Sequence, residues 1–348
     1  HRAGAEHAGG DRPGDPRAVT ALIDAYDAAF FDLDGVIYLG AVAVDGSVQA
    51  LAGLEARHTA VMFVTNNAAR AASVVIAQLN SLGFHANADT VLTSAQVATS
   101  YIAQELPAGA KVLVSGSASL AELLAEAGLT PVDTADDHPV AVVQGYDPAM
   151  TWPRLDEAAL AIQNGAKWYA TNDDASRPTE RGLVPGAGGA IAAVALTVGG
   201  QPTIFGKPFR PMLDEAVRRT RATKPIFVGD RIDTDIIGAV NAGLDSLLVF
   251  TGAHGKADLV AAGPGARPTH IGADVRALLE PARSFERTAD AVTCRGQRAV
   301  VRAGRVELDD PPESQEAQVD ALWAIAQLVW DDRALDCAGA LSSLSRIR

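Results

Sequence analysis

Residues 30–40 read FFDLDGVIYLG, and this stretch decides how the rest of the chain is interpreted. Asp32 and Asp34 stand one residue apart, directly after the apolar run at 28–31 and just before Gly35. Asp-Gly is a strong turn signal, so a hairpin turn is one interpretation. The other interpretation is that a buried strand ends here and presents two carboxylates at its tip.

The composition narrows the classes of function. The chain has 348 residues, enough for two domains, and a formal net charge of −13. This charge argues against nonspecific binding to nucleic acid or to an anionic membrane, since both need a basic surface. The sequence has no unbroken apolar span of membrane length. Two cysteines, Cys294 and Cys337, form no disulfide framework, which indicates a reducing cytoplasm.

Apolar runs of strand length alternate with helical patterns along most of the chain. AAFFDLD, TAVMFVTNN, PIFVGD and DSLLVFTG are the clearest of these runs. Short apolar strands between helices predict a Rossmann-like parallel sheet with helices on both faces. Ligands of such sheets bind beyond the carboxyl ends of the strands. The polar residues that end these runs are therefore expected to meet at one edge.

We divide the α/β chain into four parts. Residues 1–22 are expected to be a disordered tail, and residues 23–97 and 203–280 form the core. Residues 98–202 repeat the alternating pattern and form an inserted α/β unit. Residues 281–348 form a small α+β extension. Its helical stripe at residues 316–331 favours a packed appendage, with a dedicated partner helix as the alternative; the stripe comprises Val319, Leu322, Trp323, Ala326, Val329 and Trp330.

Four short motifs follow strand-like runs in a fixed order. They are Asp32-x-Asp34-Gly35, Thr65-Asn66-Asn67, Gly206-Lys207-Pro208, and Gly229-Asp230 with Asp235 five residues on. In order and type, this set resembles the haloacid dehalogenase superfamily of phosphotransferases. TNDDASRPTERGLVPGAGG and GDRIDTDI resemble its capped subfamily IIA phosphatases: nitrophenylphosphatase-like, phosphoglycolate, glycerol-phosphate and pyridoxal-phosphate phosphatases. The resemblance covers residues 24 to 280.

The chemistry of such a set follows from charge. A carboxylate that attacks a phosphomonoester dianion meets a repulsion of about 4 kcal/mol per charge pair at about 4 Å and an effective dielectric of about 20. An Asp nucleophile therefore needs cations beside it. Mg²⁺ suits hard oxygen ligands, and Lys207 adds a further positive charge.

With this resemblance, we expect Asp32 to attack phosphorus and Asp34 to protonate the leaving group. Asp32, Asp230 and the backbone carbonyl of Asp34 are the expected ligands of Mg²⁺. Asp235 supports the metal or orients Lys207. The expected phosphate contacts come from Thr65, Lys207 and Asn66, with Asn67 as a further substrate-binding candidate.

Several of these residues have simpler interpretations. Thr65 or Asp235 could serve only to cap a helix, and Lys207 could be a solvated surface lysine. Asn66 could position phosphate or brace its loop. Asn67 could cap a helix, and Asp173 and Asp174 are better explained as loop acids.

The resemblance implies that the inserted unit is a C2-type cap, and that the chain forms a homodimer through it. Arg177 lies in the loop that corresponds to the family's specificity loop and could bind a second anionic group, or could be an exposed arginine.

The favoured function is a Mg²⁺-dependent phosphatase for a small phosphorylated metabolite, such as glycerol 3-phosphate or 2-phosphoglycolate, that acts through an aspartyl-phosphate. The alternatives are a phosphotransferase to an acceptor alcohol and a non-enzymatic phosphometabolite-binding or interaction protein.

Overall fold

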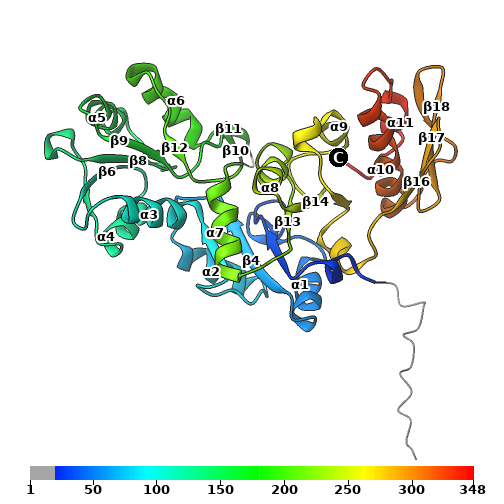
Figure 1. Ribbon diagram of the computed structural model, residues 1–348, viewed down its shortest axis with the longest axis horizontal. Helices are drawn as coiled ribbons and strands as arrows, with labels where there is room; N and C mark the ends of the chain where they lie inside the picture. Colours follow the sequence, from blue (N-terminus) through cyan, green and yellow to red (C-terminus); the bar gives the residue numbers. More distant parts are fainter. Residues whose placement is uncertain (1–19, 180) are drawn as a thin grey trace, which may run out of the picture.

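The computed structural model of the chain describes residues 20–179 and 181–348, which form three neighbouring parts (Figure 1). Most of the predicted disordered tail, residues 1–19, lies outside the described residues. Its last positions are described, and Ala21 and Leu22 are buried there. Within the two described ranges, no helix combines the length and the apolar character needed to cross a bilayer.

A six-stranded parallel sheet forms the central part, in the order β15-β14-β13-β1-β4-β5. Strand β1 lies inside the sheet between β13 and β4, and all its residues are buried. An interior strand covered on both faces reads as a continuous apolar run, as residues 28–31 do. The strands are β1 (Ala28–Phe31), β4 (Ala60–Thr65), β5 (Val91–Thr93), β13 (Pro225–Gly229), β14 (Asp245–Val249) and β15 (His270–Gly272).

Helices cover both faces of this sheet. Ala29 and Phe31 of β1 pack in one hydrophobic cluster with helices α1 (Ser47–Ala56) and α2 (Ala72–Ser81). Ala28 and Phe30 face the opposite cluster, which contains α3 (Ser94–Glu105), α7 (Arg210–Thr220) and α8 (Ile237–Ala242). The alternation follows from the two-residue period of a strand. The predicted Rossmann-like core with helices on both faces is confirmed.

A five-stranded parallel sheet forms the inserted part, in the order β12-β9-β8-β6-β7. One face packs on helices α5 (Trp152–Gln163) and α6 (Ala187–Val198). The other face carries α4 (Ala118–Glu126) and shares a hydrophobic cluster with the core. A hairpin of β10 (Ser176–Thr179) and β11 (Gly182–Pro185) carries Arg177. The sheet strands are β6 (Lys111–Ser115), β7 (Thr130–Val132), β8 (Ala141–Gln144), β9 (Lys167–Ala170) and β12 (Thr203–Ile204), the last just beyond residue 202.

The extension pairs a four-stranded antiparallel sheet with helix α10 (Gln315–Asp331). The predicted apolar stripe of α10 is largely buried, but so are Asp320, Ala321, Ala324 and Ile325 outside that stripe. The helix is buried on more than one face because it packs on the extension's sheet and also on α9 (Lys256–Ala261) and β15 of the core (Figure 1). The strands are β16 (Phe285–Arg287), β17 (Ala291–Cys294), β18 (Gln297–Arg302) and β19 (Arg305–Leu308), and helix α11 (Ala338–Ser342) follows.

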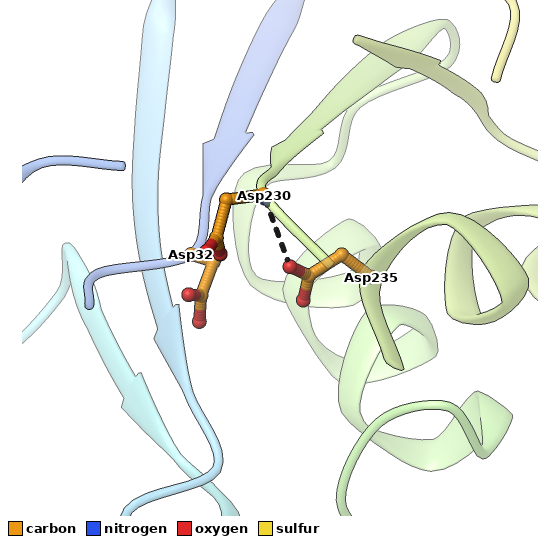
Figure 2. Close-up of side chains that lie close together, drawn as sticks. All are labelled: Asp32, Asp230 and Asp235. Atoms are coloured by element: carbon orange, nitrogen blue, oxygen red, sulfur yellow. Dashed lines mark hydrogen bonds between the residues drawn. The ribbon is translucent and has the colours of Figure 1, made fainter. Parts of the chain in front are cut away.

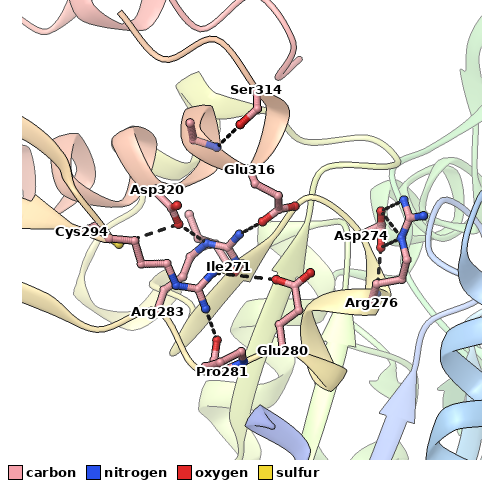
Figure 3. Close-up of polar contacts among 12 residues, drawn as sticks. Ile271, Asp274, Arg276, Glu280, Pro281, Arg283, Cys294, Ser314, Glu316 and Asp320 are labelled. Carbon is pink, nitrogen blue, oxygen red and sulfur yellow. Dashed lines mark hydrogen bonds and ion pairs between the residues drawn. The ribbon is translucent and has the colours of Figure 1, made fainter. Parts of the chain in front are cut away.

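A buried arginine ties the extension to the central sheet (Figure 3). Arg283 donates from Nε to Asp320 Oδ1 of α10 at 2.8 Å, and from a terminal nitrogen to the carbonyl of Ile271 in β15 at 3.0 Å. It also pairs with Glu316. A buried charge of this kind is stable only when it is paired and hydrogen-bonded. These contacts favour the packed appendage over a free partner helix.

Candidate active site

Three carboxylates meet at the carboxyl edge of the central sheet (Figure 2). Asp32 follows β1 and Asp230 follows β13, and these two strands are adjacent and in register. Asp235 reaches the same place from the π-helical turn Ile232–Ile236. One oxygen from each residue lies within 4.8 Å of the others. These three acids therefore meet at one edge of the sheet, as the sequence predicted.

Lys207 brings a buried positive charge to this cluster. Its side chain is 2% exposed, and Nζ donates to Asp32 Oδ1 at 2.6 Å and to Asp235 Oδ1 at 2.8 Å. Burial lowers the pKa of Lys207, but the attraction of Asp235 and Asp32 outweighs this and leaves it above its usual value. The raised pKa favours the cationic form, and the burial of the side chain excludes the alternative of a solvated surface lysine.

Asp235 holds the parts of the cluster in place. Its Oδ2 accepts from the backbone N–H groups of Asp230 and Arg231, at 3.2 and 3.1 Å, while Oδ1 is occupied by Lys207. A Cβ on Gly229 would lie 2.2 Å from the Asp235 Cβ, so only glycine allows this approach. Both carboxylate oxygens of Asp235 are engaged with protein, which fits the predicted orientation of Lys207 better than direct metal ligation.

Asp230 has an oxygen available for a ligand. Its Oδ2 accepts from the backbone N–H of Ala253 at 2.5 Å. Its Oδ1 is buried and has no hydrogen-bond partner among the described residues. Burial, together with the charge of Asp235, raises the pKa of Asp230 to about 7. Buried polar atoms are normally satisfied, so this oxygen indicates a missing partner.

The charges of the cluster identify the class of that partner. Asp32, Asp230 and Asp235 carry three negative charges when ionised, and Lys207 returns one positive charge. Burial raises the pKa of Asp32 well above its usual range, against the opposing effect of Lys207. A divalent cation would balance the two remaining charges, and carboxylate oxygens are the hard ligands that Mg²⁺ prefers. The residues present therefore fit a magnesium ion between Asp32 and Asp230.

Asp34 follows Asp32 by two residues and remains in contact with solvent. The protein around it is nevertheless close enough to raise its pKa by desolvation, while Arg70 and Lys207 act to lower it. The backbone of Asp34 forms a bridge with Tyr38 at the start of the β2 (Tyr38–Leu39) and β3 (Val42–Ala43) hairpin. A carboxyl group with a raised pKa beside a nucleophile is suited to carrying a proton.

The Thr65-Asn66-Asn67 segment is a loop, because helix α2 begins only at Ala72. Thr65 Oγ1 accepts from the N–H of Asn67, so Thr65 caps this turn and not the helix. Asn66 braces the loop: its Nδ2 donates to the carbonyl of Lys207 at 2.9 Å, and its Oδ1 accepts from the N–H of Lys207 at 2.8 Å. Asn67 is exposed and caps the N–H of Ala69.

The cap contributes residues that the sequence did not single out as functional. Asp174 Oδ1 accepts from Asn66 Nδ2 at 3.0 Å, and Asn172 Nδ2 donates to the Asn66 carbonyl at 2.7 Å. Asn66 therefore joins the core, the cap and the backbone of Lys207. Arg177 is exposed and donates from Nε to Tyr146 Oη at 2.7 Å, within the inserted unit. The described hydrogen bond of Arg177 thus does not involve the carboxylate cluster.

Family comparisons cover both halves of the core. The chain matches haloacid dehalogenase-like hydrolases over residues 29–130, and a HAD-hydrolase-like family over residues 204–278. It is 41% identical to D-glycerol 3-phosphate phosphatase of Mycobacterium tuberculosis over 91% of this chain and 89% of that protein. It is 36% identical to acid sugar phosphatase of Staphylococcus saprophyticus over 67% of this chain and 90% of that protein.

The solved structures that resemble this chain include phosphatases of the same kind. Glycerol phosphate phosphatase Rv1692 from M. tuberculosis, in complex with magnesium, is similar with a TM-score of 0.82 at 39% identity, over 94% of this chain and 98% of that chain. The p-nitrophenyl phosphatase from Archaeoglobus fulgidus has a TM-score of 0.68 at 27% identity, over 73% and 98%. The coverage of 94% means that the similarity to the mycobacterial structure includes most of the extension.

The brace at Asn66 predicts a difference between two neighbouring asparagines. Asn66→Ala leaves the buried N–H of Lys207 without its acceptor and removes the link to Asp174. It should lower the free energy of unfolding by about 1–3 kcal/mol, as expected for an unsatisfied buried donor. Asn67→Ala is the control, because Asn67 is exposed, and should cost well under about 1 kcal/mol. Urea unfolding of both variants measures this, and equal costs would contradict the bracing role of Asn66.

Proposed function

The chain belongs to the haloacid dehalogenase-like hydrolases and is a phosphatase, and from this premise we propose that it hydrolyses a small phosphomonoester with Mg²⁺ bound between Asp32 and Asp230. The observation that carries the proposal is the buried Oδ1 of Asp230, which has no hydrogen-bond partner in the part of the chain that the structure describes. It lies in a cluster whose negative charge Lys207 only partly balances. The mycobacterial phosphatase that resembles this chain was crystallised with magnesium, which supports the choice of ion.

Asp32 and Asp230 would hold the ion through side-chain oxygens, and Asp34 through its backbone carbonyl. A bound Mg²⁺ supplies positive charge next to the phosphoryl oxygens and so reduces the repulsion between two anions. Asp235 remains occupied by Lys207 and by backbone N–H groups, and it acts by orienting them.

Asp32 is the nucleophile in this proposal. One of its carboxylate oxygens forms a bond to phosphorus as the bond from phosphorus to the alcohol oxygen breaks, which gives an aspartyl-phosphate and an alkoxide leaving group. Lys207 lies 2.6 Å from Asp32 and offsets the charge of both carboxylate and phosphate. Thr65 ends the neighbouring strand and offers a hydroxyl to the phosphate.

Asp34 supplies the proton. Its raised pKa favours the protonated form, which gives its proton to the departing alkoxide. The resulting carboxylate then takes a proton from water, and the water oxygen attacks phosphorus and releases Asp32 and inorganic phosphate. Arg70 helps to stabilise the carboxylate form in this second half of the reaction, since its charge acts to lower the pKa of Asp34.

Chelation and one substitution test this mechanism together. With EDTA, turnover of p-nitrophenyl phosphate and glycerol 3-phosphate should fall to background and return with excess Mg²⁺. Asp32→Asn should lower kcat by at least about 10³-fold, because an amide is a poor nucleophile. Full turnover in chelator or in Asp32→Asn would contradict the proposal. The alternative function, a phosphotransferase, is tested with p-nitrophenyl phosphate as the donor and glycerol or glucose as the acceptor. Formation of phosphorylated acceptor would indicate the phosphotransferase.

Glycerol 3-phosphate leads as the substrate because the mycobacterial relative carries that activity and matches most of the chain.

We place the cap at residues 98–202, the core at 23–97 and 203–280, and the extension at 281–348. We also propose that Arg177, on the β10–β11 hairpin of the cap, distinguishes substrates by binding a second anionic group.

Arg177→Leu tests this selectivity. If Arg177 moves from Tyr146 to the substrate, the variant should raise KM for 2-phosphoglycolate by about tenfold or more, because a charge-assisted hydrogen bond to its carboxylate is lost. KM for glycerol 3-phosphate, which lacks a carboxylate, should change much less. Steady-state kinetics with both substrates measure this, and equal effects would dispose of the role.

The cap also supports the proposed homodimer. Trp152 and Leu196 are 73% and 89% exposed, and they lie on the packed pair of helices α5 and α6. Exposed apolar side chains mark an interface where they form a contiguous patch, and we propose such a patch on α5 and α6. Light scattering of the native protein should give the mass of two chains, and Trp152→Glu with Leu196→Glu should give one. A monomeric unsubstituted protein would remove this proposal.

A further inference from the structure

The loop after β14 encloses the Asp230 side chain. Ala253 donates its N–H to Asp230 Oδ2 at 2.5 Å, and His254 donates its N–H to the Asp230 carbonyl at 3.1 Å. A Cβ on Gly252 would lie 1.9 Å from Asp230 Oδ2, so the backbone of this loop touches the carboxylate directly. The position of residues 251–255 therefore sets which oxygen of Asp230 remains free.

The same loop also contacts the segment that follows the nucleophile. Thr251 Oγ1 donates to the Gly35 carbonyl at 2.5 Å. Gly35 has a positive φ of 88°, and a Cβ there would lie 2.5 Å from Asp230 Oδ2. Residues 251–255 thus contact both segments that carry the proposed magnesium ligands.

Residues 344–348 lie next to this loop and to α9, where C marks the end of the chain in Figure 1. The backbone N–H of Lys256 donates to the Arg348 carbonyl at 2.8 Å. Lys256 Nζ donates to the carbonyls of Leu344 and Ile347 at 2.6 and 3.0 Å. The Arg348 guanidinium donates to the Gly252 carbonyl at 2.8 Å. Four hydrogen bonds therefore join this segment to the loop and to the residue that follows it.

Two buried side chains anchor residues 344–348 to the hydrophobic core. Leu344 and Ile347 are 0% and 3% exposed, and they belong to the hydrophobic cluster shared by α9, α10 and the edge of the central sheet. Gly255 accommodates the contact, since a Cβ there would lie 2.3 Å from the Arg348 carbonyl oxygen. Buried anchors and a close backbone approach make this a fixed support for residues 251–255.

We propose that residues 344–348 position the magnesium ligand Asp230, through Arg348 and Lys256 acting on the loop at residues 251–255. This inference rests on the proposed function, because it assumes the ion between Asp32 and Asp230. Arg348 and Lys256 are positioning residues that do not touch substrate. The extension thereby acquires a role at the active site, although it contributes no group to the chemistry.

The double variant Lys256→Met with Arg348→Leu tests the proposal in the full chain. It removes three of the four hydrogen bonds and leaves the anchors Leu344 and Ile347 in place. Partners that orient metal ligands are worth about 10–100-fold in affinity, so the dissociation constant for Mg²⁺, measured by titration calorimetry without substrate, should rise about tenfold. At saturating Mg²⁺, KM for glycerol 3-phosphate should stay within about twofold, a split that general destabilisation would not produce.

Two controls isolate the effect. Arg346→Leu removes an exposed arginine whose described hydrogen bond is made by its backbone N–H, and it should leave Mg²⁺ affinity unchanged. Arg348→Lys retains a donor for the Gly252 carbonyl and should restore most of the affinity lost in Arg348→Leu. If the double variant does not fold, Arg348→Leu alone is measured, with amide hydrogen exchange at Ala253 as a second readout that should become faster.

The outcomes separate this inference from the proposed function. An unsubstituted protein that binds no Mg²⁺ would contradict the proposed function. An unsubstituted protein that binds Mg²⁺, together with folded Lys256 and Arg348 variants of equal affinity and equal exchange at Ala253, would overturn only the role of residues 344–348.

Discussion

The buried ammonium of Lys207 between Asp32 and Asp235 is the interaction on which the rest of this site depends. It is the one positive charge shown in contact with a cluster of three buried carboxylates among the described residues. Asp235 in turn accepts from the backbone N–H of Asp230, so the ion pairs of Lys207 link the residues that follow β1 and β13. An uncompensated buried charge is costly, so Lys207 stabilises the ionised form of the cluster, and a further cation would stabilise it more.

Lys207 lies where the inserted unit meets the core. Lys207 follows β12, which pairs with the sheet of the inserted unit, and its backbone is hydrogen-bonded to Asn66 of the core. Asn66 also contacts Asp174 of the cap. Asn66 thus links the backbone of Lys207 to Asp174 of the cap as well as to the core.

Much of this arrangement could be predicted from the sequence because it depends on local periodicity. Continuous apolar runs that end in Asp32, Thr65 and Asp230 predicted interior strands and their common edge. Asn66 remained undecided, since bracing and phosphate binding use the same amide and only tertiary contacts separate them. The helical pattern at 316–331 was predicted to have a single apolar stripe, because periodicity could not show that a sheet and the core would cover the helix on different sides.

The loop at residues 251–255 was missed. Its first two residues end the apolar run DSLLVFTG, which is of the same kind as the runs before the recognised acids, but the loop offers only backbone groups to Asp230. Contacts made by backbone groups carry no residue signature, so only the structure could reveal this loop and its contacts with residues 344–348.

The most direct test of the account is diffraction from crystals containing Mn²⁺ as an anomalous substitute for Mg²⁺. The account predicts an anomalous peak between Asp32 and Asp230 that Asp235 does not contact, and a peak elsewhere, or none, would contradict it.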